Sequence, residues 1–277
     1  MHDGEFGLNG RTLYQLQQVV NGFLEADEDL PTWNISYEYD KSLKIANDSQ
    51  LIINIAGLAY YITAGGYRID RKCRNSILST CFASHDFADV MVYTRLAEEK
   101  YDFNNITYPL NQIFRYRSIL CNCIMMHSSA IVYNDEAVLL CGASGAGKST
   151  QAMLWEKYQK AVVLNYDQNC VIMNSNQIKV HGSPWAGKEN CFINRSVPLK
   201  AIVFLSKSNR NQVLRADLGR AFSLIYLNNY LYPLNRVIEN KYEQIISGLV
   251  RKIPVYQMNC DMSYGAVETL EDILWQA

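Results

Sequence analysis

Short apolar runs with a period of two alternate with polar turns over residues 1 to about 108. This alternation places every second side chain on one face of an extended chain, so it predicts β-structure. The runs expected to form strands are residues 33–39, 51–55, 58–63 and 90–94. Gly65 and Gly66 add a turn signal. The pattern predicts an antiparallel accessory sheet. The residues of this region form no recognisable catalytic set.

Residues 110–126 are expected to form a connecting helix between the two regions. From His127 onward, strand-like and helix-like patterns alternate. Strands are expected at residues 130–133, 137–141, 161–165, 171–173, 178–181, 199–205 and 255–258, and helices at 150–158, 217–229, 236–250 and 264–275. Such a mixture predicts an α/β core. We therefore expect two domains, a β-rich accessory region at residues 1–108 and an α/β domain at 109–277.

Composition and charge narrow the class of protein. The 277 residues are 49% hydrophobic and 19% charged, as in an ordinary globular protein. The net charge of −1 argues against a broad nucleic-acid surface, which needs a basic excess. No signal peptide or bilayer-spanning apolar run is visible, and the eight cysteines lack a disulfide spacing. We expect a cytoplasmic protein with reduced thiols and no membrane or nucleic-acid partner.

The string Gly142-Ala-Ser-Gly-Ala-Gly-Lys-Ser-Thr150 carries the clearest chemistry, because it follows an apolar strand and precedes a helix. Glycines let backbone N–H groups turn inward around a polyphosphate, a lysine reaches the outer phosphates, and a hydroxyl holds Mg²⁺. We therefore expect ATP and Mg²⁺ to bind here, with Ser149 as a metal ligand. The predicted nucleotide-binding residues are Gly142, Ala143, Ser144, Gly145, Ala146, Gly147, Lys148, Ser149 and Thr150.

An acidic residue near this loop is the second requirement of a phosphoryl-transfer site, because the metal and the attacking group both need a carboxylate. Asp167 follows the apolar run 161–164 and lies 18 residues after Ser149. We expect it to act as catalytic base and metal ligand. The alternative is a turn aspartate between two strands.

The chain resembles a known family in several strings taken together. Three of them resemble the catalytic domain of HPr kinase/phosphorylase: His127-Ser-Ser-Ala-Ile-Val-Tyr133, the loop with its preceding strand, and Leu164-Asn-Tyr-Asp167. Two more resemble HPr-kinase-related proteins found beside ribosomal-peptide and lasso-peptide gene sets: Gly182-Ser-Pro-Trp-Ala-Gly-Lys188 and Asn194-Arg-Ser-Val-Pro-Leu-Lys-Ala-Ile-Val-Phe-Leu205. The resemblance covers roughly residues 127–275. It implies an α/β fold with a P-loop core of the HPr kinase/phosphoenolpyruvate carboxykinase type, beside the β-rich N-terminal accessory region.

The resemblance also implies roles for single residues. His127 matches a family histidine that would lie by the phosphates or orient the catalytic carboxylate; a buried structural histidine is the alternative. The family often has paired aspartates where this chain has Tyr166-Asp167, so the division of base and metal ligand stays open. Lys188 lies in a Gly/Pro-punctuated turn, where a lysine could neutralise phosphate charge during transfer or simply be solvated.

These observations favour an ATP-dependent kinase that transfers the γ-phosphoryl group to a hydroxyl, and the expected acceptor is a serine of a peptide or small protein. A nucleotide-binding regulatory module without turnover is the alternative, favoured by Tyr166 in place of a family carboxylate. A switch GTPase is disfavoured because the chain has no Asn-Lys-x-Asp guanine-reading segment. The sequence does not identify the acceptor, and it leaves a homo-oligomer open.

Overall fold

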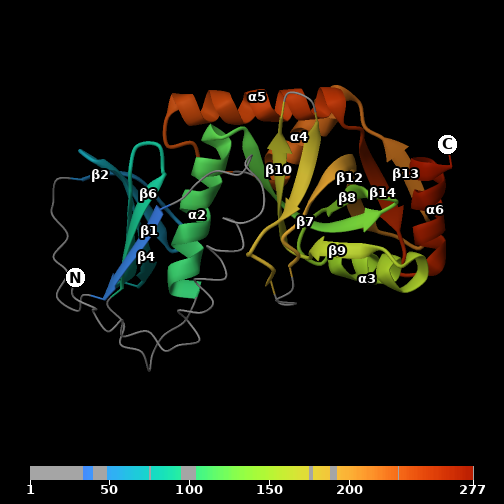
Figure 1. Ribbon diagram of the computed structural model, residues 1–277, viewed down its shortest axis with the longest axis horizontal. Helices are drawn as coiled ribbons and strands as arrows, with labels where there is room; N and C mark the ends of the chain where they lie inside the picture. The colour runs from blue at the N-terminus through green and yellow to red at the C-terminus, as the bar shows by residue number, and fades with distance from the viewer. Residues whose placement is uncertain are drawn as a thin grey trace. The chain divides into compact units, whose positions relative to one another are not determined.

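The computed structural model describes residues 34–39, 49–74, 76–94, 104–174, 177–187, 192–229 and 231–276. Within these ranges the protein is a mixed α/β structure with two sheets and five helices (Figure 1). It divides into two compact units, and the described residues change unit after Cys121. The boundary at residue 108 stays a prediction about where an independent domain starts. None of the helices in the described ranges is long and apolar enough to cross a membrane.

The first unit is a six-stranded sheet with one helix packed on it. The strands are β1 (Asn34–Tyr39), β2 (Gln50–Ile55), β3 (Leu58–Thr63), β4 (Gly66–Cys73), β5 (Ser76–Ala83) and β6 (Asp89–Thr94), in the order β1-β6-β5-β4-β3-β2. Helix α2 (Asn104–Leu120) packs on β4 and β5. The expected antiparallel sheet is present except at one edge, where β1 pairs with β6 in parallel.

The predicted helix over residues 110–126 is wrong at its C-terminal end. Helix α2 ends at Leu120, and Asn122 turns the chain with a φ of 58°. Strand β7 (Cys123–Tyr133) begins directly afterwards, and its first residues pair with β10. Residues 123–126 are apolar and buried. A buried helix and a buried strand both use such residues, so the composition of this stretch does not separate the two.

The second unit is an eight-stranded sheet with four helices (Figure 1). The strands after β7 are β8 (Glu136–Cys141), β9 (Val162–Asn165), β10 (Gln168–Met173), β11 (Ile178–Gly182), β12 (Ser196–Lys207), β13 (Gln212–Arg215) and β14 (Val255–Cys260). The helices are α3 (Lys148–Gln159), α4 (Leu218–Asn228), α5 (Arg236–Lys252) and α6 (Tyr264–Trp275). The main strand order is β11-β10-β7-β8-β12-β14-β13, with β9 also paired to β7.

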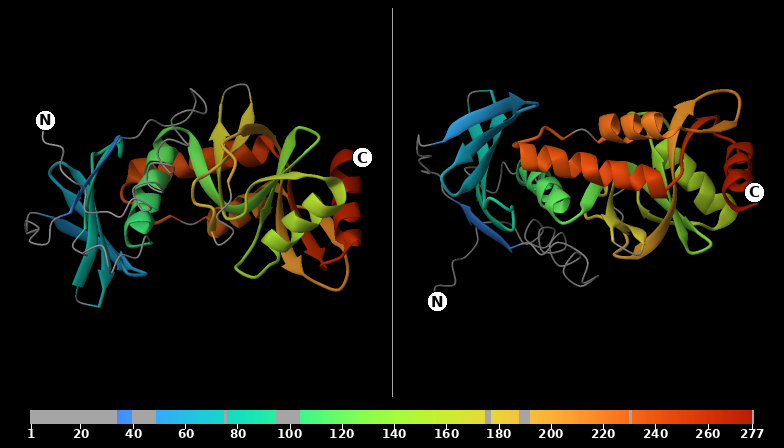
Figure 2. Two further views of the ribbon diagram at one scale, coloured as in Figure 1. Left: turned by 60° about the horizontal axis from the view of Figure 1, so that its bottom comes forward. Right: turned by 90° about the horizontal axis from the view of Figure 1, so that it is seen from above.

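Helices cover both faces of this second sheet (Figure 2). Helices α3 and α6 pack together over one face, and their apolar residues join those of β7, β8, β12 and β14 in one core around Trp155. Helices α4 and α5 pack against each other on the opposite face, where α5 contacts β7. The apolar runs of β8 and β12 are buried because helices lie on both sides of them.

Two features of the sheet bring loops together at one edge. Strand β12 is parallel to both β8 and β14, so the carboxyl ends of these three strands lie side by side. Strands β9 and β10 both pair antiparallel with β7 and are separated only by Tyr166 and Asp167. In open α/β sheets, ligands bind beyond the carboxyl ends of parallel strands.

Candidate functional site

The glycine-rich segment 142–147 joins β8 to α3, so the predicted order of strand, loop and helix is confirmed. Gly147 is the N-cap of α3 with a φ of 102°, a conformation that glycine adopts without strain. It has no side chain, and no side-chain hydrogen bond caps this end of the helix. First-turn N–H groups that lack such a cap favour an anion, and the helix dipole adds to this preference.

Lys148 folds back over the loop from the first position of α3. Its ammonium donates to the carbonyl oxygens of Gly142 at 2.9 Å and Ala143 at 3.3 Å, and the residue is only 8% exposed. Burial lowers the pKa of Lys148 below its ordinary value, while Cys141 and Asp167 act in the opposite direction. Burial also raises the pKa of the Cys141 thiol to about 12, so this neighbour is neutral near pH 7. The loop thus holds one buried cation.

A cleft of about 500 Å³ opens over the loop and joins most of the predicted site residues. Its lining includes His127, Ser144, Gly145, Gly147, Lys148, Ser149, Thr150 and Asp167 from the prediction, and Tyr166, Gly187, Lys207 and Met262 in addition. The other predicted loop residues, Gly142, Ala143 and Ala146, shape the loop: two accept from Lys148, and the Ala146 amide donates to the Ala143 carbonyl at 3.0 Å. The volume lies within the usual range for small-molecule sites.

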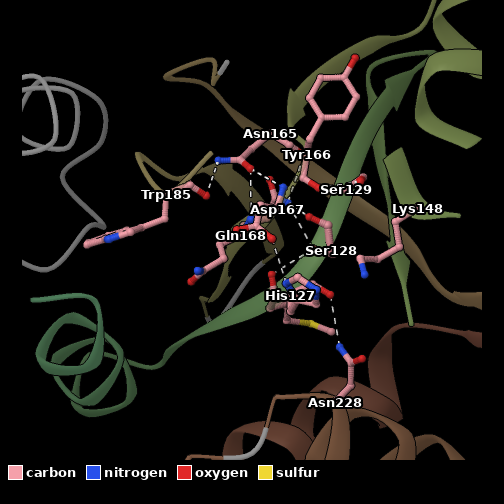
Figure 3. A network of polar contacts seen from close by, with 12 residues as sticks. His127, Ser128, Ser129, Lys148, Asn165, Tyr166, Asp167, Gln168, Trp185 and Asn228 are labelled. Carbon is pink, nitrogen blue, oxygen red and sulfur yellow. Dashed lines mark hydrogen bonds and ion pairs between the residues drawn. The ribbon is translucent and has the colours of Figure 1, made fainter. Parts of the chain in front are cut away.

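Asp167 and His127 form a pair on the wall of this cleft (Figure 3). The His127 Nδ1 atom lies 3.1 Å from Asp167 Oδ1, and the side chains are 43% and 30% exposed. The two residues between β9 and β10 interrupt pairing with β7 here, while the Ser128 amide still donates to the Asp167 carbonyl at 2.9 Å. An irregularity of this kind turns a side chain out of the regular alternation of a strand.

The end of α4 holds the backbone of His127 from the opposite side. The His127 amide donates to Asn229 Oδ1 at 2.8 Å, and Asn228 Nδ2 donates to the His127 carbonyl at 3.3 Å. Asn229 is buried and also donates to the Ile225 carbonyl at 2.9 Å. Since β8 pairs with β7 only from Ser128 onward, these amides continue the hydrogen bonding along the strand edge. His127 is therefore fixed in the cleft wall rather than buried as a core histidine.

Residues 94–275, about two thirds of the chain, match the family described as SynChlorMet cassette protein ScmC. The chain belongs to this family. It is also similar to the structure of the Hpr(Ser) kinase/phosphatase from Coxiella burnetii, with 13% identity over 55% of this chain and 93% of that one and a TM-score of 0.30. No curated protein matches the chain.

In this ScmC family member, the Tyr166 side chain turns away from the Asp167–His127 pair. Its ring packs beside the core under α3, and its hydroxyl donates to the Glu156 carboxylate. Figure 3 shows the ring pointing away from Asp167. The backbone carbonyl of Tyr166 accepts from the Ser129 hydroxyl at 2.8 Å, which helps to fix this junction. Tyr166 thus ties the junction to α3 and leaves Asp167 as the carboxylate at the cleft.

Several residues of the cleft do not stand out in the sequence. Lys207 ends β12 and Met262 follows β14. Both reach the cleft because β12 is parallel to its neighbour β8, and β14 is parallel to its neighbour β12. Both residues come shortly after a predicted apolar strand, which is the sequence feature that could have indicated them. That feature places them at the cleft only when the order of the strands in the sheet is known. The predicted residue Lys188 lies outside the described residues. Gly187, its neighbour, lines the cleft.

Proposed function

We propose that this protein is an ATP-dependent phosphotransferase with a P-loop core of the HPr kinase type. One observation supports this most strongly: Asp167, paired with His127, lines the same cleft as Lys148 and Ser149 of the glycine-rich loop. A phosphoryl-transfer site needs a loop and a cation for the polyphosphate and a carboxylate for the attacking hydroxyl. This cleft combines them.

The residues divide the work by their chemistry. The amides of segment 142–150 and the Lys148 ammonium would hold the outer phosphates, and Asp167 would accept the proton of the acceptor hydroxyl. His127 Nδ1, at 3.1 Å, would orient the Asp167 carboxylate. The Ser149 hydroxyl and the Asp167 carboxylate are hard oxygen donors, which suit Mg²⁺, and both line the cleft. Bound Mg²⁺ would neutralise phosphate charge.

The proposed acceptor is a serine hydroxyl of a peptide or small protein. This part of the proposal rests on the sequence resemblance. We further propose that the protein acts in the cytoplasm, without nucleic acid or membrane as partner, and that the N-terminal unit serves recognition or assembly, including assembly as a homo-oligomer. Lys188 stays a proposed phosphate contact, because its neighbour Gly187 lines the cleft.

A regulatory module that binds nucleotide without turnover is the second candidate. Tyr166 favours it, because this residue stands where the resembled family often has a second aspartate, and its hydroxyl is bonded to Glu156. Asp167, Lys148 and Ser149 together favour the enzyme.

A transfer assay separates the two candidates. We expect the protein, incubated with Mg²⁺ and γ-labelled ATP, to move label onto serine-containing peptides encoded near its gene. Mass spectrometry should find one added phosphate on serine, and the same peptide with serine replaced by alanine should stay unmodified. Nucleotide binding without label transfer to any peptide would support the regulatory module and overturn the enzyme.

We expect the affinity for ATP to fall at alkaline pH, because the polyphosphate binds the protonated form of Lys148. The pKa of this lysine in the free protein is lowered by burial. The affinity should therefore be constant well below that pKa and decline as the pH rises through it. This decline should begin at a lower pH than it would for an unperturbed lysine, whose pKa is about 10.4. Calorimetric titrations from about pH 8 upward would measure this, above the phosphate titration near pH 6. Lys148→Arg, which stays protonated, should flatten the profile.

A further inference from the structure

Asn165, the last residue of β9, is a buried amide at the centre of the polar network around Asp167. Its side chain is fully enclosed and makes four hydrogen bonds, two through Oδ1 and two through Nδ2. These use the two lone pairs and both N–H groups of an amide, so its hydrogen-bonding capacity is filled. Figure 3 shows it between Trp185 on one side and Asp167 on the other.

The Oδ1 atom of Asn165 fixes the backbone on both sides of the Asp167 side chain. It accepts from the Asp167 amide at 2.7 Å and from the Gln168 amide at 3.1 Å. Asparagine side chains stabilise tight turns by accepting from amides two and three residues ahead. This turn lies at the interruption between β9 and β10, where Asp167 lines the cleft.

The Nδ2 group of Asn165 fixes the segment that packs against Asp167. It donates to the Ser183 carbonyl at 2.5 Å and the Trp185 carbonyl at 3.3 Å. Two residues later, Gly187 passes so close that a Cβ there would lie 2.8 Å from the Asp167 Cβ. The Ser183 hydroxyl closes the arrangement by donating to the Gln168 carbonyl at 2.7 Å. One amide therefore holds Asp167 and the segment that restricts its movement.

We propose that Asn165 is a positioning residue for phosphoryl transfer, which sets the place of the Asp167 carboxylate without touching the nucleotide. The proposal rests on the proposed function of Asp167. Asn165 itself is buried and does not line the cleft, so its effect passes through the backbone of Asp167. Misplacing a catalytic group by about 1 Å can cost roughly 100-fold in rate.

The test compares Asn165→Ala with Asn165→Ser, which keeps an oxygen able to accept from the Asp167 amide as serine does in turns. Asn111→Ala is the matched control, because it removes another buried amide, from the first unit. We expect Asn165→Ala to lower kcat roughly 10- to 100-fold. Its affinity for Mg-ATP should change less than about threefold, because the contacts of the loop are kept. Asn165→Ser should recover part of the loss, and Asn111→Ala should leave kcat unchanged.

A second measurement does not depend on activity. The chain has four histidines, so the ¹⁵N signals of the His127 ring can be assigned by replacing each one. Since His127 Nδ1 contacts Asp167, we expect Asn165→Ala to change these signals in the same direction as Asp167→Asn. If the protein transfers no phosphate but the signals change, the positioning holds and the proposed function fails. Unchanged signals and kcat in folded Asn165→Ala and Asn165→Ser would overturn the positioning role. A fall in the nucleotide affinity of Asn165→Ala as large as the fall in kcat would also overturn the positioning role.

Discussion

Replacing Lys148 with alanine is expected to weaken Mg-ATP binding by about 100-fold, the largest loss of affinity among single substitutions in the cleft. The ammonium is buried and meets the loop carbonyls of Gly142 and Ala143, where the outer phosphates would compete for it. A hydrogen bond to a charged group contributes roughly 1.5–3 kcal/mol, and 1.4 kcal/mol corresponds to a tenfold change in affinity. Titration calorimetry with Mg-ATP measures the loss directly.

Lys157→Ala is the control for this substitution. Lys157 lies in the last turn of the same helix, where its ammonium lies over the ring of Tyr158, and it does not line the cleft. The Lys157→Ala protein should bind Mg-ATP with the affinity of the parent. Thermal unfolding of both variants shows whether the helix is intact. Parent-like affinity in a folded Lys148→Ala protein would contradict both candidate functions, since each requires nucleotide at this loop.

Elements with a strong local pattern are predictable from this sequence. Helix α6 spans residues 264–275 as predicted, and α3 differs from its prediction by two residues at the start and one at the end. The loop between β8 and α3 follows from its glycines and from the Lys148 and Ser149 side chains. In each case the signal lies within one short stretch of chain, because helix periodicity and loop chemistry are local properties.

Strands β4 and β5 were missed because buried polar residues hide their pattern. Arg68 and Asp70 on β4 are buried and paired at 3.2 Å, and Thr80 of β5 donates to Asp70 at 3.1 Å. A charged residue in a strand is predicted to be exposed unless a partner for its charge is known. Here the partner on β5 is brought into place by strand pairing across the sheet. The parallel pairing of β1 with β6 is also a long-range property.

The site was predictable only where one segment carries the chemistry. The sequence indicates Lys148, Ser149 and Asp167 by residue type and position. It does not indicate Asn228 and Asn229, which reach His127 from about a hundred residues away in the chain. These asparagines become parts of the candidate site only because the end of α4 lies beside His127 of β7. Their hydrogen bonds to backbone groups are invisible in sequence.

Asp167→Asn is expected to reduce phosphoryl transfer by roughly 100-fold or more, while Mg-ATP binding stays within about tenfold of the parent. The substitution preserves the shape of the side chain, and asparagine Oδ1 can still accept from His127 Nδ1, which lies 3.1 Å from that oxygen in the parent. The backbone contacts to Asn165 and Ser128 are also kept. What disappears is the negative charge that, in the proposed function, accepts the hydroxyl proton and contributes to Mg²⁺ binding. The loss should therefore fall mainly on the transition state.

Comparing nucleotide binding with and without Mg²⁺ separates the two roles of this carboxylate. If Asp167 holds the metal, Mg²⁺ should strengthen ATP binding less in Asp167→Asn than in the parent, because one hard oxygen ligand is lost. If it serves only as base, Mg²⁺ should have the same effect on binding in both proteins, while transfer alone falls.

The control is Asp135→Asn, which alters a carboxylate that is 93% exposed and outside the cleft lining. It should change neither the effect of Mg²⁺ on ATP binding nor the rate of transfer. Phosphoryl transfer at the parent rate in Asp167→Asn would assign proton acceptance to another group of the cleft wall. His127 would then be the next residue to replace, because its imidazole contacts Asp167 and can accept a proton.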